Sequence, residues 1–88
     1  MEFEFDAGKS ESNRRERGFG FGFAARIFLA RVSVTFARTE SGEIRMKAVG
    51  WIDDIFYAVI FVDEGDTRRI IPARRANRKE CKQWLASE

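Results

Sequence analysis

The chain contains stretches in which every second residue is apolar and stretches in which apolar residues recur every three or four positions. The first pattern is typical of half-buried strands and the second of amphipathic helices. A continuous apolar run from Ile55 to Val62 is typical of a strand buried on both faces, so we expect it at the centre of the sheet. The other predicted strands are Met1–Phe5, Val32–Phe36, Glu43–Val49 and Thr67–Ala73.

Two helices are predicted near the N-terminus. Asp6 is a favourable N-cap for a helix that runs to about Arg17, and Gly18 fits the left-handed position that commonly ends a helix. A second helix is expected from Phe21 to about Ala30, because apolar residues recur there with helical spacing. Its apolar stripe consists of Phe21, Ala24, Ala25 and Phe28.

A third helix is predicted at the C-terminal end. Asn77, with Glu80 three residues later, has the spacing of a capping box, in which each side chain bonds the backbone N–H of the other residue. The apolar stripe of this helix consists of Cys81, Trp84 and Leu85. We expect Trp84 to be substantially buried against the sheet, because the helix offers no other apolar stripe.

Polar turns at Arg38–Gly42 and Asp63–Asp66 connect neighbouring strands and predict antiparallel pairing. Pro72 has no N–H to donate, so its end of the last strand must lie at an edge or a terminus. The element order β-α-α-β-β-β-β-α predicts an α+β fold: a mostly antiparallel sheet of about five strands, covered on one face by two N-terminal helices and one C-terminal helix. Residues 1–88 form one domain, since so short a chain supports one core.

The composition excludes several classes of site. Cys81 is the only cysteine and the chain has no histidine, so neither a disulfide framework nor a zinc site of the usual kind can form, and we expect no cofactor or metal. The acidic N-terminus is unlike a secretory signal. Arg26 and Arg31 interrupt the longest apolar stretch, Phe19–Phe36, so we expect no membrane span and a cytoplasmic protein.

The net charge of +2 conceals a strong asymmetry. Residues 67–88 carry seven basic and two acidic side chains, a net charge of +5, whereas residues 1–66 carry nine basic and twelve acidic ones, a net charge of −3. The basic residues are Arg68, Arg69, Arg74, Arg75, Arg78, Lys79 and Lys82. This distribution predicts a polyanion-binding end on an acidic body, although each arginine alone is typical of a solvated surface.

The strand-turn-helix run from Arg68 to Glu80 has the chemistry of a phosphate site without a metal. The arginine guanidinium forms bidentate hydrogen bonds to phosphate oxygens, and a helix N-terminus adds free N–H groups. We expect phosphate contacts from Arg69, Arg74 and Arg75, and RNA-binding contacts along the backbone from Arg68, Arg78 and Lys79. On the first helix, Lys9, Asn13 and Arg17 share one face and extend the same groove. Asn13 has an alternative role, bonding the backbone across a loop.

Several motifs along nearly the whole chain resemble the BrnT toxins of bacterial type II toxin-antitoxin systems. They are Phe3-Glu4-Phe5-Asp6, Lys9, Asn13, Gly18, the helix with Phe21, Ala24 and Phe28, Gly42-Glu43-x-Arg45, Gly50 and Arg69-Ile70-Ile71-x-Ala73-Arg74-Arg75-Ala76. The resemblance implies a RelE-like fold and a metal-independent ribonuclease. It also implies a BrnA-like antitoxin partner with a ribbon-helix-helix DNA-binding segment, a hetero-oligomer with that partner and repression of the shared promoter.

The chain departs from the family pattern at four places. The family usually has Lys-His-Gly where Glu16-Arg17-Gly18 stands, a histidine or tyrosine at Phe61, serine at Pro72 and tryptophan at Phe5. Histidine is the usual acid or base in RNA cleavage, and this chain has none. The alternative function is therefore a catalytically weakened homologue that binds antitoxin or RNA in autorepression.

For the enzyme, we hypothesise that the ribose 2′-hydroxyl attacks the adjacent phosphate. The catalytic residues Arg69, Arg74 and Arg75 would stabilise the growing charge. Arginine stays protonated at neutral pH, which leaves Lys9 or Glu43 as the proton acceptor. We expect Lys9 slightly more, because Glu43 and Arg45 have the alternative of a structural ion pair on the sheet. The antitoxin is expected to cover the arginine surface and so to compete with RNA.

Overall fold

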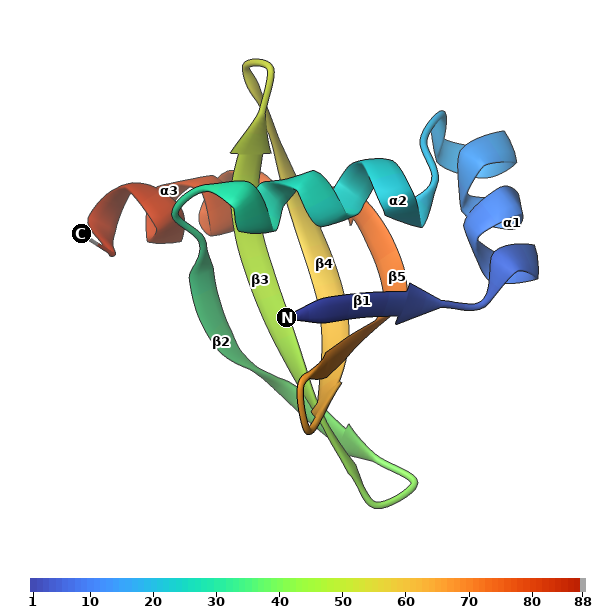
Figure 1. Cartoon of the computed structure of the whole chain (residues 1–88). Coiled ribbons are helices and arrows are strands. Elements are labelled where there is room, and N and C mark those ends of the chain that lie inside the picture. Colours follow the sequence, from blue (N-terminus) through green and yellow to red (C-terminus); the bar gives the residue numbers. More distant parts are fainter. Residues whose placement is uncertain (88) are drawn as a thin grey trace.

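The strands form one five-stranded sheet in the computed structural model, which describes residues 1–87 (Figure 1). The strands are β1 (Glu2–Phe5), β2 (Ser33–Glu40), β3 (Glu43–Ile52), β4 (Ile55–Glu64) and β5 (Thr67–Arg75). Their order across the sheet is β1-β5-β4-β3-β2, and every neighbouring pair is antiparallel except β1 with β5. The predicted fold class, element order and central strand are confirmed.

The helices are α1 (Ala7–Arg17), α2 (Phe21–Ala24) and α3 (Arg78–Ala86), and the 3-10 helix η1 (Ala25–Leu29) continues directly from α2. Asp6 caps α1 by accepting a hydrogen bond from the Lys9 N–H at 2.8 Å, and Gly18 ends it with a φ of 90°. The predicted second helix lies where expected, but its second half is 3-10 rather than α-helical. No helix within residues 1–87 has the length and apolar character needed to span a membrane.

Four strands, β2, β3, β4 and β5, continue past their predicted ends. β2 continues through Arg38 to Glu40, which pairs with Glu43, so the turn contains only Ser41 and Gly42. Both turn residues have positive φ values, of 51° and 78°, as two-residue hairpins require. Polar residues did not end the strand as predicted, because this end of β2 lies at a solvent-exposed sheet edge where polar side chains remain hydrated.

The main core lies between one face of the sheet and the α2–η1 segment, which crosses that face in Figure 1. Its fully buried large side chains include Phe21, Ile27, Val59, Phe61 and Ile70. Gly50 of β3 allows the close approach of η1, because a Cβ atom there would lie 2.7 Å from the Ile27 Cβ. The helix and the sheet are therefore fixed in one relative position.

α3 packs on the opposite face of the sheet, so the prediction that all helices cover one face was wrong. Glu80 of α3 contacts Lys47 and Arg74, whose neighbours along their strands, Ala48 and Ala73, belong to the core under α2. Successive strand residues point to opposite faces, which places α3 on the other side. Trp84 is only half-buried there, with its ring 5.1 Å from that of Phe56.

Pro72 lies where its sequence constraint predicts. β1 ends opposite Ile70, so beyond that point the outer edge of β5 has no partner strand. The pairing with β4 also shifts here, because two residues, Ile71 and Pro72, face the single residue Ile60. A bulge at a sheet edge tolerates proline, since no ladder hydrogen bond is lost.

Candidate functional site

One group of charged residues lies on the α3 side of the sheet, at the end away from α3. Arg69 of β5 extends over β4 and donates from Nη2 to Oε2 of Glu43 on β3 at 2.6 Å. Its Nη1 lies 3.3 Å from Oε1 of Glu64. The side chains of Arg69 and Glu43 are 35% and 34% exposed, so solvent reaches both members of the pair. The hydrogen bond to Glu43 raises the pKa of Arg69 above its usual value.

Arg45 extends this group along β3. Its Nη1 lies 2.9 Å from Oε2 of Glu40, and its Nη2 lies 3.8 Å from Oε1 of Glu43. The expected Glu43–Arg45 ion pair is therefore present, but it is longer than the Glu43–Arg69 contact. The Nε of Arg45 is buried without a hydrogen-bond partner among residues 1–87. Glu43 thus lies between two guanidinium groups, one accessible and one largely buried.

Arg74 belongs to a different cluster. Its Nη1 and Nη2 donate to the two carboxylate oxygens of Glu80 at 2.7 and 2.8 Å. Glu80 is 2% exposed and also accepts from the Asn77 N–H and from the Lys47 ammonium, both at 2.9 Å. The bonds from Arg74, followed by that from Asn77, lower the pKa of Glu80 to about 2. The capping box is confirmed, and the predicted phosphate ligand Arg74 is engaged in holding α3 on the sheet.

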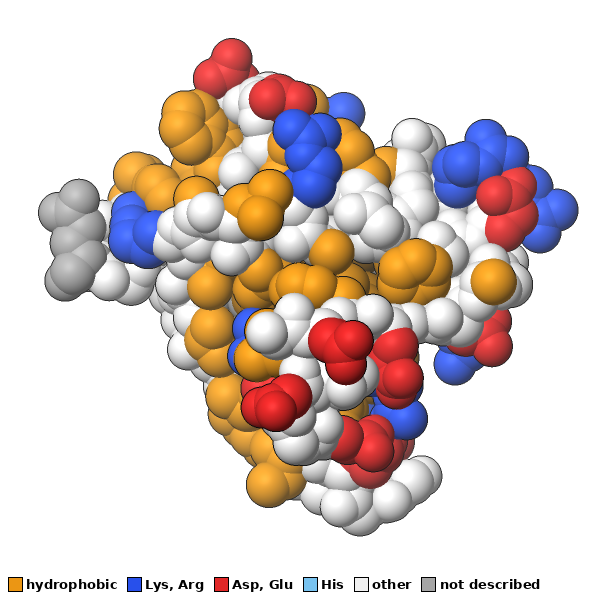
Figure 2. Space-filling view, in the orientation of Figure 1, with side chains coloured by type: hydrophobic (Ala, Val, Ile, Leu, Met, Phe, Trp, Pro, Cys, Tyr) orange, Lys and Arg blue, Asp and Glu red, His pale blue; other side chains and the backbone are white. Residues whose placement is uncertain are grey.

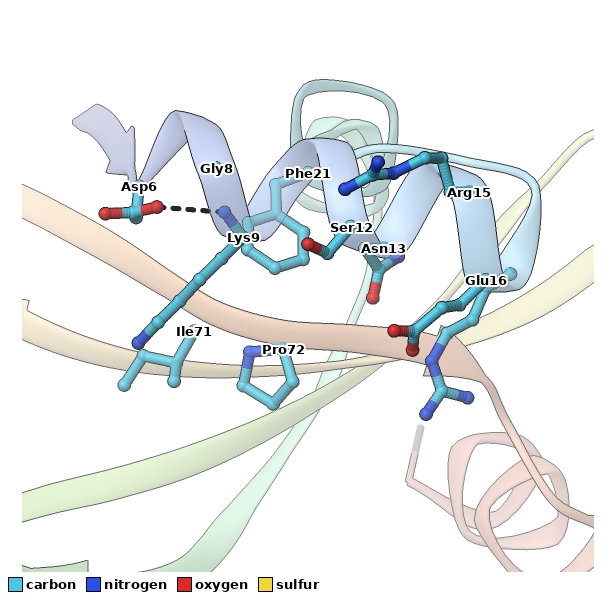
Figure 3. Close-up of a pocket in the computed structure, with 11 residues that line it drawn as sticks. Asp6, Gly8, Lys9, Ser12, Asn13, Arg15, Glu16, Phe21, Ile71 and Pro72 are labelled. Carbon is cyan, nitrogen blue, oxygen red and sulfur yellow. Dashed lines mark hydrogen bonds between the residues drawn. The ribbon is translucent and has the colours of Figure 1, made fainter.

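A third arrangement is the pocket between α1 and the edge of β5, shown in Figure 3. Lys9, Asn13 and Arg17 line it together with Ile71 and Pro72, and its volume is about 580 Å³. The predicted shared face of α1 is confirmed. Asn13 is nearly buried and donates from Nδ2 to the carbonyl of Phe19 at 2.8 Å, as its alternative role requires. Figure 3 shows the Asn13 oxygen directed into the pocket and the Lys9 side chain extended toward Ile71.

The remaining predicted residues fall into two groups. Arg68 has a structural environment, because its guanidinium stacks 4.1 Å from the Phe61 ring centroid and binds both oxygens of Asp63. Arg75, Arg78 and Lys79 are exposed at the end of β5 and the start of α3, and none of them forms an ion pair within residues 1–87. These three cations are therefore available to an anionic partner.

The single arginine surface expected from the sequence is divided in the structure. Arg69, Glu43 and Arg45 are brought together on the sheet, whereas Lys9, Asn13 and Arg17 face a separate pocket to which no arginine of β5 contributes. The two arrangements adjoin along β5, since Arg69 precedes Ile71 and Pro72 on the strand. No group of three acidic or cysteine side chains in residues 1–87 has the geometry to hold a metal ion.

Three acidic residues were missed as parts of these clusters. Glu40 and Glu64 were assigned to turns, yet they bind Arg45 and Arg69. Glu80 was assigned a capping role only. The capping spacing Asn77-x-x-Glu80 does fix the Glu80 side chain at the start of α3, and Arg74 just before that helix could have identified the ion pair.

Phe61, where the family usually has histidine or tyrosine, lies in the core on the α2 side and is 1% exposed. This departure therefore does not alter the charged group around Arg69, which lies on the other face of the sheet. Arg17, where the family has histidine, lines the α1 pocket instead.

Comparison with known proteins identifies one family. A family model described as the ribonuclease toxin, BrnT, of a type II toxin-antitoxin system matches residues 5–80. This range covers most of the chain, from the end of β1 to Glu80 in α3. No curated protein matches the sequence.

Proposed function

Because the chain belongs to the BrnT family of type II toxin-antitoxin ribonuclease toxins, we propose that it cleaves RNA at the Arg69–Glu43 pair by a mechanism that uses no metal. The observation that carries the proposal is the accessible contact of 2.6 Å between a guanidinium and a carboxylate. It supplies a phosphate ligand and a proton acceptor at one point of the sheet. An RNA substrate places this activity in the cytoplasm.

The reaction begins when the RNA phosphate binds Arg69. Glu43 accepts the proton of the ribose 2′-hydroxyl, and the oxygen attacks the adjacent phosphorus. The bond from phosphorus to the 5′ oxygen breaks, and this oxygen takes a proton from water. The products are a 2′,3′-cyclic phosphate and a 5′-hydroxyl end.

The arginines stabilise the charge that grows on the phosphoryl oxygens. Arg69 is exposed enough to exchange part of its carboxylate contact for phosphate, whereas the largely buried Arg45 positions Glu43 from the other side. Loss of one such donor typically lowers the rate roughly 10²- to 10³-fold. Arg74 contributes indirectly, because Glu80 occupies both of its terminal nitrogens.

Lys9 has a binding role in this mechanism. Its pocket on α1 contains no arginine of β5 and no contact to Glu43. Lys9 and Arg17 bind the RNA backbone as it passes the edge of β5, and the Asn13 oxygen accepts from a ribose or base. We expect Lys9→Met to raise KM and to leave kcat nearly unchanged.

The family description implies an antitoxin partner. A BrnA-like antitoxin that forms a hetero-oligomer with the chain and lies across Arg75, Arg78 and Lys79 would neutralise these cations and exclude RNA at the same time. None of the three has an ion-pair partner within residues 1–87, which supports this position.

Cleavage in the presence of a chelator tests the proposal. The wild-type protein should cleave RNA in EDTA, and Arg69→Ala should lower the cleavage rate at least about 100-fold. Arg38→Ala is the matched control, since Arg38 is an exposed arginine whose one ion pair within residues 1–87 is with Glu40. Equal rates for Arg69→Ala and Arg38→Ala would remove Arg69 from the mechanism.

The same experiment addresses the alternative of a catalytically weakened homologue, which the absence of histidine favours. If wild type leaves RNA intact over a wide concentration range while still binding it, the chain acts as a binding module and the cleavage mechanism is wrong.

A further inference from the structure

A second pocket lies below the β3–β4 turn, on the side of the sheet that carries α3. It has a volume of about 380 Å³ and is lined by Trp51, Asp54, Phe56, Trp84 and Leu85. Trp51 is 49% exposed and Leu85 is 62% exposed. In Figure 2, hydrophobic side chains gather between this turn, at the top of the view, and the end of α3. Both tryptophans of the chain face this pocket.

The aromatic walls are held in place by the fold. Trp51 and Phe56 are paired across the β3–β4 hairpin, and their rings stack at 6.4 Å with an angle of 27°. Trp84 contacts the Phe56 ring with its edge and donates from Nε1 to the carbonyl of Arg31 at 3.1 Å. The Arg31 guanidinium covers Trp84 at 3.6 Å from the ring centroid. A flat ligand therefore meets a platform that is already ordered.

One carboxylate lines the pocket. Asp53 and Asp54 form the two-residue β3–β4 turn with φ values of 48° and 71°. Asp53 is paired with Arg26 at 3.6 Å, whereas Asp54 forms no ion pair within residues 1–87. Its oxygens remain available to accept hydrogen bonds from a ligand in the pocket.

Two cations of α3 lie beside the pocket. Arg78 and Lys82 share one face of α3 with Leu85, which lines the pocket, because their spacings are four and three residues. Neither cation forms an ion pair within residues 1–87. Anionic groups are thus attracted to the rim, whereas the interior offers aromatic faces and one acceptor.

We infer that this pocket binds a guanine base of single-stranded RNA, an inference that rests on the proposed ribonuclease function. Bases of single-stranded RNA are commonly stacked on aromatic side chains and read at their Watson–Crick edge. Guanine presents N1–H and an amino group side by side on that edge, which matches the two acceptor oxygens of Asp54. Arg78 and Lys82 bind the adjacent phosphates.

A protein side chain fits this combination less well. An apolar side chain would make no use of the exposed Asp54 carboxylate, and an acidic segment would be repelled by its charge. A nucleotide satisfies the aromatic walls, the carboxylate and the cations together.

The guanine pocket and the Arg69–Glu43 pair are positioned to act on one RNA strand. Trp51 lies on the same face of β3 as Glu43, because the two residues are eight positions apart, an even spacing. Their separation along β3 is roughly 26 Å at about 3.3 Å per residue. This distance is within reach of an RNA segment of the length that single-strand-binding domains contact, about 4–16 nucleotides. The pocket would therefore select where the strand is cut.

Intrinsic fluorescence tests the inference directly, because both tryptophans line the pocket. The four 5′-mononucleotides and inorganic phosphate should be titrated separately into the whole protein. We expect saturable quenching by 5′-GMP with an affinity about tenfold higher than for 5′-UMP, and no quenching by phosphate. Asp54→Asn should remove the preference for GMP, and Trp51→Ala should lower the affinity for all four nucleotides.

Asp53→Asn is the matched control, since it changes the neighbouring carboxylate of the same turn and should keep the preference. Circular dichroism verifies that each variant is folded. Equal affinities for all four nucleotides, or a GMP preference that survives Asp54→Asn, would overturn the inference. Quenching by the antitoxin together with no response to nucleotides would assign the pocket to the protein partner and would also overturn it.

This titration is independent of cleavage. Glu43→Gln should bind GMP as wild type does. If GMP binding is normal but Glu43→Gln cleaves RNA at the wild-type rate, the proposed catalytic pair fails and the guanine pocket remains. If Glu43→Gln is inactive but GMP does not bind, the pocket fails and the catalytic pair remains.

Discussion

Arg69 and Arg74 lie on one strand and point to one face of the sheet, yet their surroundings differ. Arg69 donates one hydrogen bond to Glu43, whose carboxylate is accessible to solvent. Arg74 donates two hydrogen bonds to Glu80, a carboxylate with almost no exposure. The burial of the partner carboxylate therefore separates an arginine that can bind phosphate from one that holds a helix in place.

The largest effect is expected when the buried carboxylate is removed. Glu80→Ala leaves Arg74 and Lys47 without their anion and exposes the Asn77 end of α3, and we expect it to cost about 3–5 kcal/mol of unfolding free energy. Urea denaturation measures the loss. Glu64→Gln, which removes an exposed carboxylate from Arg69, should change stability by less than about 1 kcal/mol. Similar losses in the two variants would erase the distinction between the two clusters.

The acid stability of the protein should reflect the same cluster. The folded-state pKa of Glu80 is lowered from 4.5 to about 2, so its contribution is complete above pH 4.5 and is lost as the pH falls toward 2. The unfolding free energy should fall by about 3 kcal/mol across this window, at about 1.4 kcal/mol per pKa unit. Glu80→Gln should flatten this part of the curve. An unchanged acid profile in that variant would show that other carboxylates control it.

Removing the accessible arginine should affect catalysis without affecting folding. Arg69→Ala should keep the urea midpoint of wild type and lose cleavage, whereas Arg74→Ala should lower the midpoint and lose activity only as far as α3 detaches. Measuring both variants at a temperature where each is folded separates the two causes. A full loss of activity in folded Arg74→Ala would place Arg74 at the phosphate after all.

Much of this organisation could be predicted from the sequence, because it depends on local signals. Asp6, Gly18 and the Asn77–Glu80 spacing fix helix ends through backbone hydrogen bonds, and the apolar run of β4 identifies the central strand. The Arg69–Glu43 pair could not be predicted, because its residues are 26 positions apart and meet only through the register of β3, β4 and β5. The run of arginines looked uniform, yet Arg74 pairs with the nearby Glu80 of α3 instead.

A smaller effect is expected for the antitoxin. Arg75→Glu combined with Arg78→Glu should weaken both antitoxin and RNA binding, and wild-type association should weaken as salt rises. Glu2→Lys is the control, since Glu2 is exposed on β1 and is paired with Thr67, so both affinities should stay nearly unchanged. Displacement of labelled RNA by antitoxin measures the competition. Simultaneous binding with unchanged affinities would place the antitoxin elsewhere.

The most direct test of the Arg69–Glu43 pair is a single-turnover cleavage assay in EDTA that compares Glu43→Gln with Glu64→Gln. Both variants remove a carboxylate that contacts Arg69, but only Glu43 also lies beside Arg45. We predict that Glu43→Gln slows cleavage by about 10²- to 10⁴-fold at saturating RNA, and that Glu64→Gln stays within about threefold of wild type. Cleavage by Glu43→Gln at the wild-type rate would contradict the assignment of Glu43 as the proton acceptor.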